Sequence, residues 1–198
     1  MPIHRKHLYF PLLIGLSGLV IVAYIYFRPP FWTGFLFLGF CLGVSWFVRT
    51  RYVVFFKGLN LLNRQKFRAA EIEFLTFLEQ LKKSPSLKNQ ARFWYYGAFT
   101  ADIEAMTMNN LGVIKMAQDQ PEPASAYLQR ALQIDQRYAK PHYNLAVLAG
   151  VAGDEDLARQ HFQKALDLGY DGDTFDQFLQ KIVVEYAKTY AGRNSINE

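Results

Sequence analysis

The sequence is poor in the side chains that build metal and disulfide sites. It has one cysteine among 198 residues, which excludes a disulfide framework and any site that needs several cysteine ligands. Four histidines are present, and they are too scattered to indicate a metal site: His4, His7, His142 and His161. We therefore expect neither a bound metal nor a cofactor.

Sequence motifs of catalysis are also missing. There is no glycine-rich phosphate loop, no nucleophile elbow, no His-Glu-x-x-His pattern and no carboxylate pair in a recognisable setting. Cys41 lies within an apolar run, where a thiol usually acts as a small apolar group. These absences predict that the protein has no catalytic residues and is not an enzyme.

Acidic residues are absent from the first part of the chain. Residues 1–57 contain six Lys or Arg and no Asp or Glu, whereas the remaining residues carry sixteen Lys or Arg against seventeen Asp or Glu. The net charge of +5 therefore does not come from the region outside residues 1–57. A nucleic-acid-binding domain needs a basic patch on its folded surface. We expect no nucleic-acid partner.

Two long uncharged runs dominate this basic segment. Residues 8–27 and 31–48 contain no Asp, Glu, Lys or Arg, and the turn-forming sequence Arg28-Pro29-Pro30 separates them. A helix of about 20 apolar residues is long enough to cross a bilayer. The sequence predicts a membrane anchor over residues 1–50, built as a hairpin of two transmembrane helices, with the lipid bilayer as one partner.

The distribution of Lys and Arg then predicts an orientation for this hairpin. Basic residues flank it at both outer ends, and the loop between the runs holds only Arg28. By the positive-inside rule, we expect an integral membrane protein whose termini and remaining domain lie in the cytoplasm.

Small residues recur four positions apart in the second run. Gly39 and Gly43 form a GxxxG spacing, which allows two helix backbones to approach closely in lipid. Two interpretations stay open. The glycines pack against the first helix of the hairpin, or they form the contact of a homodimer or of a complex with another membrane protein.

The rest of the chain contains an internal repeat. Asn110-Leu111-Gly112 recurs as Asn144-Leu145-Ala146, and the sequence at 129–132 recurs at 163–166, each time 34 residues later. A 34-residue unit with small residues at its eighth, twentieth and twenty-seventh positions resembles the tetratricopeptide repeat family. The resemblance implies pairs of antiparallel helices, in which the small residues allow the helices to touch.

This frame divides the chain into units. We predict an all-α protein in which the hairpin is followed by an α-solenoid of about three helix pairs and a C-terminal capping helix. The repeats cover residues 51–172, with a degenerate unit at 51–84, an insertion at 85–104 and regular units at 105–138 and 139–172. The capping helix covers residues 173–191, and a flexible tail covers residues 192–198.

The resemblance also implies a binding surface. Members of the family hold protein or peptide ligands on the concave face, which the first helix of each unit lines. Asn110 and Asn144 are the best polar candidates there, because a side-chain amide can pair with an extended peptide backbone. The positions that correspond to the groove in the two regular units are Met106, Asn109, Asn110, Val113, Lys140, Tyr143, Asn144 and Val147.

Two functions follow as hypotheses. The first is a membrane-anchored adaptor or scaffold that binds another protein through its concave face and aids assembly of a membrane complex. The second is a constitutive structural subunit of a larger membrane complex, held through the transmembrane hairpin.

Overall fold

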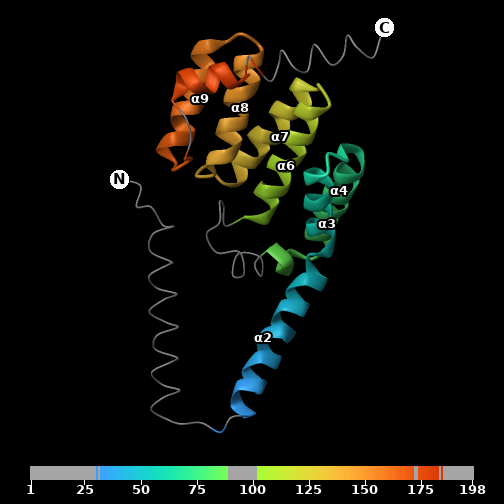
Figure 1. The fold of residues 1–198 in the computed structure, drawn as a ribbon. Coiled ribbons are helices and arrows are strands. Elements are labelled where there is room, and N and C mark those ends of the chain that lie inside the picture. The colour runs from blue at the N-terminus through green and yellow to red at the C-terminus, as the bar shows by residue number, and fades with distance from the viewer. Residues whose placement is uncertain (1–29, 31, 89–101, 172–173, 183, 185–198) are drawn as a thin grey trace.

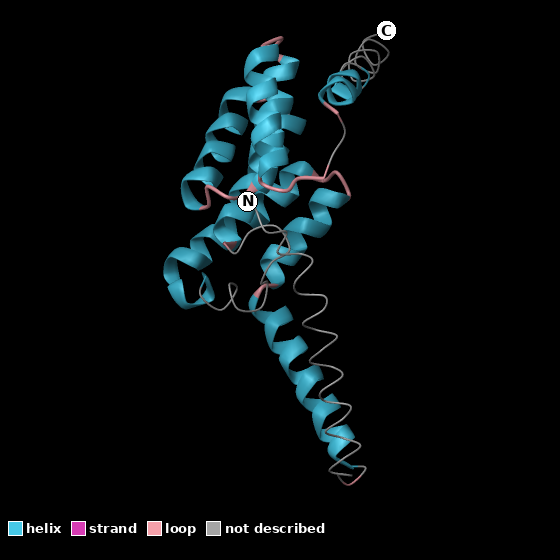
Figure 2. Ribbon diagram, turned by 90° about the vertical axis from the view of Figure 1, so that its left-hand side faces the viewer, coloured by secondary structure: helices cyan, strands magenta, loops and turns pink. Residues whose placement is uncertain are grey.

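The computed structural model describes residues 30, 32–88, 102–171, 174–182 and 184. Every regular element among these residues is a helix, and no strand occurs in them (Figures 1 and 2). The predicted all-α class is therefore confirmed for the described part of the chain.

The first described helix stands apart from the others. Helix α2, Trp32–Arg51, projects away from the packed helices in Figure 1, and only Tyr52 separates it from the next helix. Its large apolar side chains face outward, with Phe35 69% exposed and Trp46 70% exposed. Helix α2 therefore contributes little to the core of the protein.

The predicted transmembrane hairpin requires a correction. Among the described residues, no helix is both long enough and apolar enough to cross a membrane. Helix α2 corresponds to the predicted span 31–48, but Thr33, Gly34 and Arg51 lie at its ends and shorten its apolar part below the roughly 20 residues that a span needs. The predicted span 8–27 lies outside the described residues. The prediction of an integral membrane protein, with its cytoplasmic orientation, is contradicted by this finding.

Three helix pairs follow α2 and stack in chain order, as an α-solenoid does (Figure 1). Each pair packs more extensively within itself than against its neighbours. The pairs are α3 (Val53–Asn63) with α4 (Phe67–Lys83), α6 (Ile103–Ala117) with α7 (Pro121–Ile134), and α8 (Ala139–Val151) with α9 (Glu155–Asp167).

Residues on either side of these pairs are described in part. Residues 85–88 and 175–182 are also helical. Residues 89–101, within the predicted insertion, lie outside the described residues, as do the predicted tail and the part of the predicted capping helix beyond residue 184.

Small residues set the distance between the two helices of a pair. A Cβ atom built on Gly112 of α6 would lie 2.7 Å from the side chain of Leu128 on α7. The same contact recurs in the first pair, where a Cβ on Gly58 would lie 2.9 Å from the ring of Phe74. Real atoms do not approach this closely, so the expectation that a small residue is needed at this position is confirmed.

The turn within each pair uses the same backbone conformation. Gln65, Asp119 and Gly153 have φ angles of 56°, 60° and 81°, and each follows the first helix of its pair. Asp119 and Gly153 are one 34-residue period apart. A left-handed residue at this point is therefore a property of the repeat and not of one sequence.

Charged side chains join the first two pairs. The Lys115 ammonium group on α6 lies 2.6 Å from a carboxylate oxygen of Glu71 on α4, and Gln118 donates a hydrogen bond to the same carboxylate. Burial acts to raise the pKa of Glu71, but the hydrogen bonds from Lys115 and Gln118 and the charge of Lys115 lower it below its ordinary value. Glu71 is therefore ionised at neutral pH and links α4 to α6.

Candidate functional site: the face lined by α6 and α8

Two asparagines join the first helices of the two regular units. Helices α6 and α8 are in direct contact, and the Nδ2 group of Asn144 on α8 donates a 2.9 Å hydrogen bond to Oδ1 of Asn109 on α6. Asn109 is only 3% exposed, whereas Asn144 is half-buried. The structure therefore pairs two of the predicted site residues side chain to side chain.

This amide pair keeps unused hydrogen-bonding capacity. An asparagine has two N–H donors and an oxygen that accepts two bonds. Within the described residues, the Nδ2 group of Asn109 has no acceptor and Oδ1 of Asn144 has no donor. A peptide backbone offers one carbonyl and one N–H per residue, which is the complementary pair of groups.

The apolar candidates of the last unit are used for packing. The Tyr143 ring stacks on Tyr170 with centroids 4.4 Å apart and meets the edge of Phe178 at 5.4 Å. Val147 packs on the same cluster, which the helical residues 175–182 help to form. Gly150 of α8 lies close to this segment as well, because a Cβ there would be 2.9 Å from Ile182. Tyr143 and Val147 are thus held against the C-terminal helix.

The remaining candidates differ in their surroundings. Met106 packs against the core cluster formed by the first two helix pairs. Asn110, Val113 and Lys140 are half-buried. Asn110 directly follows Asn109 in the sequence. Asn110, Val113 and Lys140 stay predicted site residues.

The structure adds residues that the sequence did not single out for this face. Tyr170 and Phe178 cover Tyr143, although both lie beyond the positions that the resemblance assigns to the groove. The Asn109–Asn144 bond was equally hard to foresee, because it joins the fifth position of one unit to the sixth position of the next. In the sequence, the only indication of this bond is that Asn109 and Asn144 are separated by one repeat period plus one residue.

Gly39 and Gly43 occupy an open part of α2. Apart from the adjoining part of α2, none of the described residues has an atom within 4 Å of a Cβ atom built on either glycine. They therefore do not bring α2 close to another described helix. The alternative partner for packing, residues 8–27, lies outside the described residues, and a homodimer through these glycines stays a prediction.

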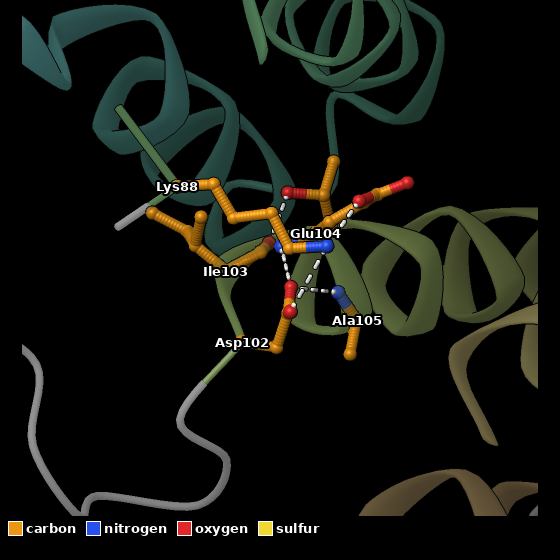
Figure 3. Close-up of polar contacts among 6 residues, drawn as sticks. Lys88, Asp102, Ile103, Glu104 and Ala105 are labelled. Carbon is orange, nitrogen blue, oxygen red and sulfur yellow. Dashed lines mark hydrogen bonds and ion pairs between the residues drawn. The ribbon is translucent and has the colours of Figure 1, made fainter. Parts of the chain in front are cut away.

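A separate hollow of about 680 Å³ lies among α4, α6 and α7. Its walls are mainly apolar, and its lining includes Lys88. The side chain of Lys88 lies between two carboxylates (Figure 3). The Lys88 ammonium group is 3.1 Å from Asp102 and 2.8 Å from Glu104. Burial acts to lower the pKa of Lys88, but these bonds raise it above its ordinary value.

The charged side chains of Lys88, Asp102 and Glu104 stabilise the fold. One carboxylate oxygen of Asp102 also accepts hydrogen bonds from the backbone N–H groups of Glu104 and Ala105 and so caps the start of α6 (Figure 3). Lys88 thereby fixes the chain on both sides of residues 89–101. Because these charged groups satisfy one another, the hollow shows no arrangement for chemistry.

The described residues also hold no group of three or more His, Cys, Asp or Glu side chains that could surround a metal ion. What the geometry offers is a contact surface with amide groups, built on a stack of helix pairs.

The comparisons with known proteins agree with the helix pairs. Among curated proteins, none matches the sequence. Residues 102–171, which form α6 to α9 and the turns between them, match the tetratricopeptide repeat family. Repeats of this family generally mediate contacts between proteins and are typically not enzymes. The two regular helix pairs of this chain are therefore similar to tetratricopeptide repeats.

Proposed function

We propose that the protein is an adaptor that holds an extended segment of another protein on the face lined by α6 and α8. The observation that carries this proposal is the Asn109–Asn144 pair. It crosses between two repeats, and its unused amide groups match those of a peptide backbone.

The position of the pair supports the same function. Asn109 is almost completely buried, so its side chain is fixed and holds the half-buried Asn144 in one orientation, which reduces the freedom that Asn144 loses when a ligand binds. The Oδ1 atom of Asn144 has no donor among the described residues, and a ligand N–H that donates to it satisfies this acceptor. Asn110, Val113 and Lys140 extend the proposed contact surface along the same two helices.

The proposal is tested by removing the amide groups without leaving one of them unpaired. The double variant N109L/N144L replaces both partners with apolar side chains of similar size, which is far less disruptive than removing one partner alone. Q129L is the matched control, because Gln129 is exposed on α7 and its described hydrogen bond is to Ser125 of the same helix.

Each variant is purified from its own cells with an affinity tag, and the associated proteins are quantified by mass spectrometry. We expect proteins that accompany the wild-type and Q129L chains to be depleted at least tenfold with N109L/N144L, while circular dichroism shows the same helix content for all three. The same set of proteins in equal amounts with all three chains would contradict the proposal.

A further inference from the structure

Two histidines meet on the faces of α8 and α9 that pack together. Nδ1 of His142 lies 3.2 Å from Nδ1 of His161, and the ring centroids are 5.5 Å apart. Each nitrogen lies one ring radius from the centroid of its own ring. The centroid separation exceeds the nitrogen separation by close to two ring radii, so the two nitrogens lie on the line between the centroids and point at each other. Both side chains are half-buried.

This geometry requires unlike tautomers in the neutral pair. One ring carries its proton on Nδ1 and donates it, and the other carries its proton on Nε2 and accepts at Nδ1. The arrangement therefore places two nitrogen atoms around one point, with a proton between them. A metal ion bound by both nitrogens would replace that proton but lie off the line between them, because its bonds of about 2.0–2.1 Å are longer than half of the 3.2 Å separation.

The preceding repeat shows that the fold does not need histidines at these positions. The residues one period earlier, 34 positions before His142 and His161, are Met108 and Tyr127. Both are half-buried, and both lie along the same hollow beside α4. The same place in the repeat frame thus accepts a thioether and a phenol, and the histidine pair is particular to the last unit.

We propose that His142 and His161 form a two-histidine site for a divalent transition metal ion such as Zn²⁺, which clamps α8 to α9. Two ligands of a tetrahedral zinc ion with Zn–N bonds of about 2.0–2.1 Å are about 3.3–3.4 Å apart, close to the observed separation of the nitrogens. Because the two nitrogens point at each other, each ring must turn by roughly 35° to direct its lone pair at a shared ion. Water, or a side chain of a bound protein, completes the coordination.

The protons balance without release to solvent. The neutral pair holds two N–H protons, one on Nδ1 of one ring and one on Nε2 of the other. On metal binding, the ring with the Nδ1 proton loses it and gains one on Nε2, so both rings then carry Nε2–H and coordinate through Nδ1. The positive charge of Lys164 on α9 acts on His142 and opposes a cation, which limits the affinity.

The test is a zinc titration of the full-length, metal-free chain at neutral pH, followed by calorimetry and by thermal unfolding. The variants are H142Q, H161Q and the double variant H142M/H161Y, which carries the side chains of the preceding repeat. We expect one Zn²⁺ per wild-type chain and a rise in its melting temperature. Each single variant should bind at least tenfold more weakly, and the double variant should fold but show no zinc-dependent rise.

Nitrogen NMR of the imidazole rings gives a second readout, in which zinc should shift the Nδ1 resonances of both His142 and His161 in the wild-type chain. If zinc bound with equal strength to the wild type and to H142M/H161Y, the proposal would be overturned. Binding at His4 and His7 would produce that result. A melting temperature of the wild type that does not respond to zinc overturns it as well.

Discussion

Gly112 controls how closely the two helices of a repeat pack. Its neighbour Leu128 occupies the space that a side chain at position 112 would need. We expect G112A to lower the free energy of unfolding by about 1–3 kcal/mol, the usual cost of overpacking a core, although alanine is the better helix former. Chemical denaturation of the wild type and the variant measures this difference.

A glycine in an open position provides the control for this substitution. Apart from the adjoining part of α2, the described part of the chain places no atom within 4 Å of a Cβ atom at Gly39, so G39A should leave the stability unchanged or raise it slightly. Equal effects of G112A and G39A would show that close packing is not the reason for Gly112.

Gln65 occupies a backbone conformation that costs energy for any residue with a Cβ atom. Its φ angle is 56°, whereas the corresponding turn of the last unit has Gly153. Replacing Gln65 with glycine relieves the strain of the left-handed conformation, roughly 1–2 kcal/mol. Glycine is also more flexible in the unfolded chain, which offsets roughly 0.5–1 kcal/mol of that stabilisation. We therefore expect Q65G to raise the free energy of unfolding by roughly 0.5–1 kcal/mol.

The adjacent residue gives a matched comparison, again by denaturant unfolding. Arg64 has an ordinary φ of −90°, so R64G has no strain to relieve and should lower the stability. Stabilisation by R64G, or destabilisation by Q65G, would contradict this account of the turn.

Between elements, the Asn109–Asn144 bond couples α6 to α8. Each single variant, N109L or N144L, leaves one amide unpaired in a buried or half-buried place, and we expect it to cost about 1–3 kcal/mol. The double variant should cost clearly less than the sum of the single variants. A double-mutant cycle measured by urea unfolding gives the coupling, and strict additivity would show that the two side chains do not interact.

The contact between α8 and α9 should depend on pH in the metal-free protein. Burial, the charge of His161 and the charge of Lys164, in that order, lower the pKa of His142 to about 4 from an ordinary value of 6.5. Burial lowers the pKa of His161 as well. Because the unfolded chain binds protons more readily, the stability is complete above pH 6.5 and is lost progressively as the pH falls toward 4.

This dependence is measured as the melting temperature of the metal-free chain between pH 8 and pH 4. H142M/H161Y is again the matched control, because its two side chains do not titrate in this range. We expect a smaller decrease for this variant than for the wild type. Identical pH profiles would show that the histidine pair does not set the acid sensitivity.

Sequence and structure agree best where one element packs on the next. The 34-residue period predicts regular units at 105–138 and 139–172. Helix α6 begins at Ile103, two residues before the first of these ranges, and α7, α8 and α9 lie inside the two ranges. The buried alanines at 124, 131, 158 and 165 are fully inaccessible to solvent, as close packing of the helices requires. A repeated pattern of small residues reports local packing, which is why it could be predicted.

Contacts between units were harder to predict. Tyr143 and Val147 occupy groove positions in the repeat frame, yet a segment beyond the repeats covers them. The four histidines look scattered along the chain, although antiparallel helices bring His142 and His161 together. Such contacts depend on which element follows the repeat, and the period contains no information about that element.

At the scale of the whole molecule, the prediction of a transmembrane hairpin was wrong for the described residues. Counting uncharged residues overestimates the apolar length of a helix, since threonine, glycine and serine are uncharged but contribute little to its hydrophobicity. The exposed apolar surface of α2 remains a feature of the molecule that the repeat pattern does not explain.

We propose that a segment of another protein lies against α6 and α8. The most direct measurement is site-specific photo-crosslinking in cells that produce the full chain, with the photoreactive residue at Asn110 on α6 or Lys140 on α8, which leaves the Asn109–Asn144 pair intact, and at Gln129 as the control on α7. We expect one discrete adduct from both Asn110 and Lys140, containing the same partner peptide, and none from Gln129. Equal labelling from all three positions, or none from Asn110 and Lys140, would contradict this proposal.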